Sequence, residues 1–206
     1  MLIKICGITR LDDAHAAVDA GARALGFVFW PDSPRFIDPY RARAIRSTLP
    51  AFVTAVGVFV NQPLEYVTGV AALVRLGVVQ LHGDETIDYA AAIQTPVVKA
   101  LTIGGAAIDE WPARATILLD ATDPTRRGGT GVPIDWTAAA AVAARRPILL
   151  AGGLTPENIA EAIERVRPFG IDVSSGVERS PGIKDHDRMR RLCEAVHATS
   201  DFATRS

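Results

Sequence analysis

Strand-length apolar runs alternate with amphipathic stretches along almost the whole chain, and this alternation constrains the fold more than any other feature. Eight runs are apolar at nearly every position, as expected of strands that are buried on both faces of a parallel sheet. They cover residues 2–6, 25–29, 53–60, 78–81, 97–101, 116–119, 148–151 and 171–173. A strand followed by a helix, repeated eight times, predicts a single-domain (β/α)8 barrel of the TIM type with parallel strands.

Four of the stretches between these runs show the spacing of a helix that packs one face on a core. Their apolar positions are Ala14, Ala17, Val18 and Gly21; Val67, Val70, Ala71 and Val74; Ile159, Ala162, Ile163 and Val166; and Met189, Leu192, Cys193 and Val196. A doubly wound open sheet is the competing architecture, but it usually has fewer strands and carries its glycine-rich turn first. We expect the barrel to span residues 1–197, with only a short helix within residues 103–111, and residues 198–206 to form a flexible tail.

Composition and charge exclude several classes of function. The chain has 206 residues, and 49 % of them are apolar, which suits one domain with a large core. Its 22 basic and 23 acidic side chains give a formal charge of −1, so we expect neither nucleic acid nor an anionic membrane as a partner. No apolar run approaches the roughly 20 residues of a membrane span, and the N-terminus lacks the apolar stretch of a signal peptide.

The cysteines and histidines form no disulfide or metal pattern. Cys6 and Cys193 fall in unlike contexts, one on a strand and one on a helix, which favours a reducing, cytoplasmic environment. The four histidines are scattered without the spacing of metal ligands: His15, His82, His186 and His197. We therefore expect no metal site built from these residues.

Small residues follow the seventh and eighth strands. Gly152 and Gly153 end the first of these segments, and Thr155 and Pro156 then have the residue types of an N-cap and a first helical position. The second segment ends in Ser174, Ser175 and Gly176, which again leave backbone N–H groups uncovered. In a (β/α)8 barrel the ends of these two strands often hold one phosphate group, so we expect a small phosphorylated substrate. The competing interpretation is that these glycines only form tight turns.

Two residues at strand ends have the chemistry of a base and an acid. Cys6 closes the first strand, and Thr9 with Asp12 resembles a capping box, so a helix start beside the thiol is expected to lower its pKa. Asp120 closes the sixth strand, where an apolar barrel mouth would raise its pKa and allow it to act as a general acid. The alternatives are a buried, inert cysteine and an aspartate that only caps a loop.

Other charged residues near strand ends are less specific. Arg35 follows the second strand and is suited to a bidentate grip on a carboxylate, or is an ordinary solvated arginine. His82 either contacts substrate or orients its loop. Lys99 is a candidate for Schiff-base chemistry, whereas Lys4 is expected to be structural. The glycine-rich residues 126–131 form either a lid or merely a long loop.

Motifs in order along nearly the whole chain resemble those of phosphoribosylanthranilate isomerase. The matching blocks are residues 4–9 (KICGIT), 27–35 (FVFWPDSPR), 56–61 (VGVFVN), 79–85 (VQLHGDE), 118–120 (LLD), 128–131 (GGTG), 150–156 (LAGGLTP), 172–178 (DVSSGVE) and 181–185 (PGIKD). The first and last blocks are highly specific. One departure is Ile134 before the Asp-Trp pair, where the family more often has phenylalanine.

The resemblance implies an Amadori rearrangement of N-(5-phosphoribosyl)anthranilate in tryptophan biosynthesis, without cofactor or metal. It makes Cys6 the general base and Asp120 the general acid, and it assigns Arg35 to the anthranilate carboxylate. The loops with Gly152 and Gly153, and with Ser174, Ser175 and Gly176, would hold the phosphate; His82 and Asp172 are expected to contact substrate. The protein is expected to be a monomer or a homodimer. Competing functions are another phosphate-handling barrel enzyme, of the lyase or aldolase type, and a non-catalytic sugar-phosphate sensor.

Overall fold

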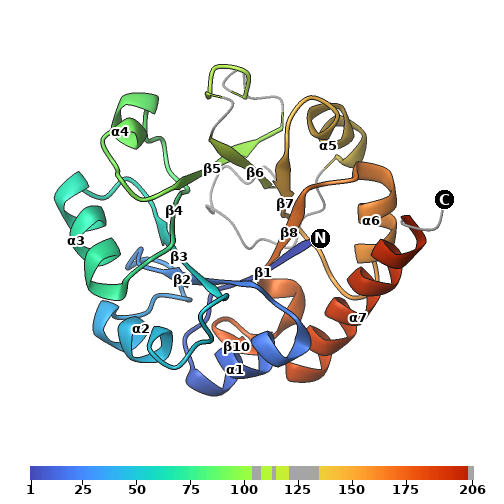
Figure 1. Ribbon diagram of the computed structural model, residues 1–206, viewed down its shortest axis with the longest axis horizontal. Helices are drawn as coiled ribbons and strands as arrows, with labels where there is room; N and C mark the ends of the chain where they lie inside the picture. Colours follow the sequence, from blue (N-terminus) through green and yellow to red (C-terminus); the bar gives the residue numbers. More distant parts are fainter. Residues whose placement is uncertain (104–107, 113–114, 121–134, 204–206) are drawn as a thin grey trace.

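Eight parallel strands close into a barrel in the computed structural model, which describes residues 1–103, 108–112, 115–120 and 135–203 (Figure 1). Each strand pairs with its neighbours in chain order, and β8 pairs with β1 to complete the ring. The strands are β1 Leu2–Cys6, β2 Ala24–Val28, β3 Thr54–Phe59, β4 Val78–Leu81, β5 Val97–Thr102, β6 Thr116–Asp120, β7 Ile148–Leu150 and β8 Gly170–Val173. The predicted (β/α)8 barrel is confirmed, and no strand end differs from its prediction by more than one residue.

Helices cover the outside of the barrel (Figure 1). They are α1 Leu11–Ala20, α2 Pro39–Arg46, α3 Leu64–Val74, α4 Ile87–Ala91, α5 Trp136–Ala143, α6 Ile159–Val166 and α7 His186–Ala203. A short 3-10 helix η1 (Ser175–Val177) and an antiparallel pair, β9 (Glu178–Ser180) with β10 (Ile183–Lys184), separate β8 from α7. All positions of the four predicted helical stripes are buried except Val18 and Gly21, which are half-buried.

One connection of the barrel is held by a side chain where the prediction places a short helix. Between β5 and β6 the described residues form turns and no helix. The guanidinium of Arg146 donates hydrogen bonds to the carbonyl oxygens of Ile108, Trp111, Pro112 and Ala115. Because a guanidinium has five donors in a fixed plane, one arginine satisfies several carbonyl groups that a helix would have paired internally.

The start of α1 differs from its prediction. The helix begins at Leu11, and Arg10 occupies the N-cap position without a side-chain cap. The hydroxyl of Thr9 donates to the carbonyl oxygen of Gly182 and so takes no part in a capping box with Asp12. The prediction of a capping box was wrong because a long-range partner, invisible in the local sequence, binds the Thr9 hydroxyl.

The start of α6 also lies later than predicted, at Ile159. A separate turn over residues 156–158 comes first, and the backbone N–H of Thr155 just before it donates to the side chain of Asn158 at 2.8 Å. The amide nitrogen of Asn158 donates in turn to the carbonyl oxygen of Gly153 at 2.9 Å. The N-cap position of α6 is therefore Asn158, while the Thr155 hydroxyl accepts from the backbone N–H of Glu157 and caps the turn that leads into the helix.

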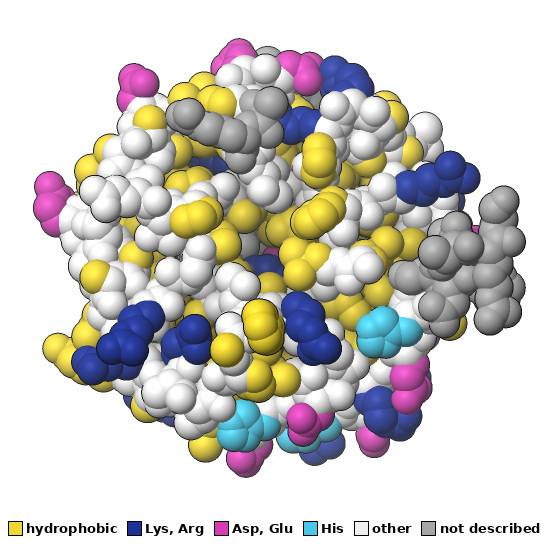
Figure 2. Space-filling view, in the orientation of Figure 1, with side chains coloured by type: hydrophobic (Ala, Val, Ile, Leu, Met, Phe, Trp, Pro, Cys, Tyr) yellow, Lys and Arg dark blue, Asp and Glu magenta, His cyan; other side chains and the backbone are white. Residues whose placement is uncertain are grey.

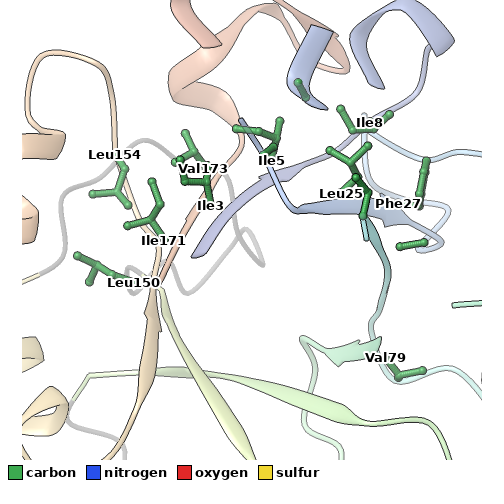
Figure 3. Close-up of a cluster of buried hydrophobic side chains, with 14 of the residues drawn as sticks. Ile3, Ile5, Ile8, Leu25, Phe27, Val79, Leu150, Leu154, Ile171 and Val173 are labelled. Atoms are coloured by element: carbon green, nitrogen blue, oxygen red, sulfur yellow. The ribbon is translucent and has the colours of Figure 1, made fainter. Parts of the chain in front are cut away.

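Alternation along the strands separates the core from the barrel interior. Figure 3 shows outward-facing side chains such as Ile3 and Ile5 from β1 and Phe27 from β2, which pack in the core between the strands and the helices. The intervening residues Lys4 and Cys6 point into the barrel, because successive side chains of a strand face opposite sides. The barrel interior therefore holds the Lys4–Asp172 ion pair together with a small apolar cluster that includes Leu118 and Leu149, whereas the main apolar core lies outside the strands.

The last helix, α7, extends beyond the predicted end of the barrel. α7 continues across the predicted boundary at residue 197 as far as Ala203, whereas residues 204–206 lie outside the described part, so the flexible tail stays a prediction. On the face in Figure 2, hydrophobic side chains gather around the centre and most acidic side chains lie at the edge. Within the described residues, no helix combines the length and the apolar composition that crossing a membrane requires.

Candidate functional site

A pocket opens at the C-terminal ends of the strands, where parallel orientation brings all the strand ends to one end of the barrel. All the residues to which the resemblance assigns a role line this pocket: Cys6, Arg35, His82, Asp120, Gly152, Gly153, Asp172, Ser174, Ser175 and Gly176. Val28, Val58 and Trp30 add an apolar wall beside Cys6. The fold therefore assembles side chains that are far apart in the sequence around one cavity.

Backbone groups form the side of the pocket at the C-terminal ends of β7 and β8. Gly152 and Gly153 have φ angles of 81° and 64°, in the left-handed region that favours glycine. Gly176 approaches Leu154 so closely that an added Cβ would lie 1.8 Å from the Leu154 carbonyl oxygen. Only glycine fits at this contact between the two turns. The absence of side chains also allows an anion to reach backbone N–H groups directly.

The thiol of Cys6 lies at the end of β1, above a buried ion pair. Lys4 Nζ donates to Asp172 Oδ1 at 2.9 Å, and both side chains are nearly inaccessible. Burial raises the pKa of the Cys6 thiol, the Lys4 ammonium opposes that rise, and the Asp172 carboxylate adds to it. The expected lowering of the Cys6 pKa is therefore wrong, because burial dominates and α1 starts too late to place an N-cap beside the thiol.

His82 connects Asp120 with a glutamine that the sequence analysis did not identify. His82 Nε2 lies 3.4 Å from Asp120 Oδ2, and the side-chain nitrogen of Gln80 lies 3.0 Å from His82 Nδ1. With the Gln80 amide donating to Nδ1, the proton of the neutral imidazole is on Nε2, which faces Asp120. Gln80 is buried, and within the described residues its Oε1 has no hydrogen-bond partner. The sequence did carry a signal for Gln80, because a residue two positions before His82 on the same strand faces the same side of the barrel.

Arg35 already binds a carboxylate of the protein itself. Its Nε and Nη2 donate to Glu178 at distances of 2.7–3.2 Å, and Lys184 Nζ donates to the same carboxylate at 2.8 Å. Burial by itself raises the pKa of Glu178, but the hydrogen bonds from Arg35 and the charge of Lys184 outweigh it and lower the pKa. Neither Glu178 nor Lys184 was among the predicted site residues, although both fall in blocks that carry the family resemblance.

Comparison with known proteins fits this geometry of a thiol, a carboxyl group and two glycine-containing turns around one barrel mouth. A family model described as N-(5'-phosphoribosyl)anthranilate (PRA) isomerase matches residues 3–195. The chain belongs to this family. It is 48 % identical over 201 residues to a PRA isomerase of Geobacter metallireducens, covering 95 % of this chain and 98 % of that protein. It is 51 % identical over 194 residues to a PRA isomerase of Trichlorobacter lovleyi, covering 92 % and 95 %.

Solved structures of PRA isomerases share the same barrel. The enzyme from Thermotoga maritima superposes with a TM-score of 0.89 at 43 % identity, covering 96 % of this chain and 100 % of the other. A second PRA isomerase structure, with a TM-score of 0.86 at 42 % identity and coverage of 96 % and 100 %, contains reduced 1-(o-carboxyphenylamino)-1-deoxyribulose 5-phosphate. Family membership therefore rests on both the sequence and the three-dimensional structure.

Lys99, the candidate for Schiff-base chemistry, lies outside the pocket of this PRA isomerase family member. Its Nζ donates to Glu85 Oε2 at 2.8 Å and to the carbonyl oxygen of Gly83 at 2.6 Å, and its side chain is buried. Glu85 also accepts hydrogen bonds from the backbone N–H groups of Asn61 and Gly83. Lys99 therefore holds the loop after β4, and the aldolase-type alternative lacks its nucleophile there.

Two further expectations concern the loop of residues 126–131 and the binding of a metal. Residues 126–131, the predicted lid or long loop, lie outside the described residues, as does Ile134 in the departure from the family pattern. In the part of the chain that the structure describes, no group of three or more His, Cys, Asp or Glu side chains is placed to hold a metal ion.

Proposed function

We propose that this chain isomerises N-(5-phosphoribosyl)anthranilate to 1-(2-carboxyphenylamino)-1-deoxyribulose 5-phosphate in tryptophan biosynthesis. The observation that carries the proposal is that Cys6 and Asp120, at the ends of β1 and β6, line one pocket together with the turns after β7 and β8. An Amadori rearrangement needs an acid and a base on different sides of one sugar. A phosphate held at a fixed point sets where that sugar lies between them.

The acid acts first in the proposed mechanism. Asp120, protonated, donates its proton to the ring oxygen of the ribose, and the bond between that oxygen and C1′ breaks. The anthranilate nitrogen supplies the electron pair that forms the C1′=N bond, which gives an open-chain iminium. His82, 3.4 Å from Asp120, orients the carboxyl group for this transfer.

The base acts second. Cys6 as a thiolate takes the proton from C2′, and the electrons of that C–H bond form a C1′=C2′ double bond while the iminium nitrogen becomes neutral. The resulting enolamine tautomerises to the C2′ ketone, which is the product. The positive iminium next to C2′ makes this proton acidic enough for a thiolate, and the ammonium of Lys4 below Cys6 favours the thiolate form.

Binding groups surround these two residues. The glycine and serine turns hold the phosphate, and Asp172 and His82 contact the sugar. Arg35 holds the anthranilate carboxylate through Nη1, since the bonds to Glu178 use Nε and Nη2. The reaction moves protons within one molecule, so no step requires a cofactor or a metal.

The proposal extends to the location, the oligomeric state and the partners of the protein. A soluble phosphorylated substrate suits a cytoplasmic enzyme that acts as a monomer or a homodimer and has neither nucleic acid nor membrane as a partner. One related structure is of monomers generated from the dimeric PRA isomerase of Thermotoga maritima. Light scattering coupled to gel filtration measures the oligomeric state of this chain directly.

The decisive experiment generates phosphoribosylanthranilate in situ and follows the loss of its fluorescence after the protein is added. Turnover with formation of the deoxyribulose product is the expected result. A sugar-phosphate sensor would instead bind the substrate stoichiometrically and leave the fluorescence of excess substrate unchanged. That outcome would replace the isomerase proposal with the sensor.

A further inference from the structure

A hairpin beyond the eighth strand places a buried lysine beneath the site, and no step of the proposed reaction uses it. β9 and β10 pair antiparallel, with Lys184 opposite Glu178. The backbone N–H of Lys184 donates to Asp13 Oδ2 of α1 at 3.1 Å, which ties the hairpin to the barrel. The Lys184 side chain is 0 % exposed. A lysine so completely enclosed must have its charge satisfied by specific partners.

Three oxygen atoms surround the Lys184 ammonium, which matches its three N–H donors. Nζ donates to the carbonyl oxygen of Cys6, to the carbonyl oxygen of Ser174 at 3.3 Å and to Glu178 Oε1 at 2.8 Å. The Ser174 hydroxyl also donates to the Cys6 carbonyl oxygen, at 3.2 Å. One buried cation therefore connects the backbone of the proposed base with the first residue of the turn after β8.

The charges in this cluster do not cancel. Arg35 and Lys184 are two cations that share the single carboxylate of Glu178, which leaves an excess of one positive charge. The other pair near the thiol, Lys4 with Asp172, is neutral as a unit. Burial lowers the pKa of Lys184, and the Glu178 carboxylate opposes that effect. This excess charge lies beside the pocket that Cys6 and Arg35 line.

We infer that Lys184 is a positioning residue that aligns Cys6 with the turn at Ser174 and whose charge favours the thiolate form of Cys6. The inference deepens the proposed function, because it rests on Cys6 as the base. The charged groups that act on Cys6 come from several elements: Lys4 on β1, Asp172 on β8, and Lys184 on the hairpin, which is itself paired with Glu178. Of these, Lys184 alone contacts both the Cys6 backbone and the turn after β8.

The test measures the alkylation rate of Cys6 by iodoacetamide as a function of pH, in a Cys193→Ala background. Cys193 is fully buried, and burial raises its pKa to about 11, so its removal eliminates only a minor background signal. Lys184→Gln retains N–H donors without the charge, whereas Lys184→Met removes both. We expect both variants to raise the midpoint of the pH profile by about 1 pH unit. Arg179→Met, which removes an exposed cation from the same hairpin, is the matched control and should leave the midpoint unchanged.

Lys184→Gln separates the effect of the Lys184 charge from that of its hydrogen bonds. A wild-type midpoint in Lys184→Gln would overturn the inference, and this variant decides the matter if Lys184→Met does not fold. Alkylation requires no turnover, so it reports on Lys184 even if the wild-type protein fails to isomerise phosphoribosylanthranilate. If the wild-type protein is active, Lys184→Gln should lower kcat at a given pH with little change in KM, and a change confined to KM would contradict the inference.

Discussion

The turns after β7 and β8 line the same pocket as Arg35, but the turns are built from backbone, whereas Arg35 belongs to a cluster of charged side chains. In the turns, Gly152, Gly153 and Gly176 leave the main chain uncovered. In the cluster, Arg35, Glu178 and Lys184 hold one another through buried ion pairs. In the proposed function the two sides recognise an anion by different means, and we expect substitutions on each side to have different effects.

The difference has a physical origin in what each side can tolerate. A backbone cradle carries no titratable group, so it is insensitive to the loss of a charge but sensitive to any added Cβ. A cluster of ion pairs tolerates small changes of shape, but the removal of one member leaves a buried charge without its partner, which is strongly unfavourable. Adding a Cβ atom therefore tests the backbone side, whereas removing a charge or changing the pH tests the charged side.

The largest effect is expected at Cys6 and Asp120, the base and the acid of the proposed mechanism. Cys6→Ser retains the shape but gives a far weaker base, and Asp120→Asn cannot donate a carboxyl proton. Each should lower kcat by about 10² to 10⁴ while substrate affinity changes little. Steady-state kinetics with phosphoribosylanthranilate measure both parameters. Near wild-type kcat in both variants would remove the acid–base mechanism.

The next effect concerns the charged side. Arg35→Ala should lower kcat/KM roughly 30- to 700-fold, because it deletes one member of a desolvated set of charges. This factor corresponds to a loss of about 2 to 4 kcal/mol in transition-state stabilisation. Arg190→Ala, which removes an arginine from an exposed ion pair on α7, is the control and should be neutral. Normal turnover by Arg35→Ala would show that another group holds the anthranilate carboxylate.

A smaller effect is expected on the backbone side. Gly176→Ala would place a Cβ 1.8 Å from the Leu154 carbonyl oxygen, so the two turns must separate. We expect KM to rise about tenfold, and inhibition by inorganic phosphate to weaken in parallel, with little change in kcat. Gly69→Ala is the matched control, since its Cβ meets nothing within 4 Å on helix α3. It should retain activity and add roughly 0.5 to 1 kcal/mol of stability. Equal KM values for the two alanine variants would contradict the backbone cradle.

The smallest effect is a difference in acid stability. The pKa of Glu178 is lowered from 4.5 in the folded protein, so the unfolded state binds more protons in this range. The contribution of Glu178 to the free energy of unfolding is therefore fully present above pH 4.5 and is lost as pH falls toward the folded-state pKa. Urea unfolding of the wild type and of Glu178→Gln across this window measures the difference. The gap between the two should narrow on acidification, and a constant gap would refute the assignment.

Much of the architecture follows from local sequence patterns. The eight apolar runs were located within one residue of the strands because period and length are properties of neighbouring residues. The parallel order of the strands then places Cys6, His82 and Asp120 at one barrel end without further information. The starts of α1 and α6 escaped prediction for the opposite reason, since Thr9 and Asn158 bind backbone groups of loops outside the helix pattern.

The sequence by itself determined the barrel, its core and the set of residues at the strand ends. Only the tertiary structure decided how the charges pair: Arg35 and Glu178 are 143 residues apart, and Lys184 and Cys6 are 178 residues apart. It also decided the direction of the Cys6 pKa, because burial and the charges of distant residues act together there. Periodic burial is encoded residue by residue along the chain. The pairing of charges depends on which loops meet in space, and no local pattern carries that information.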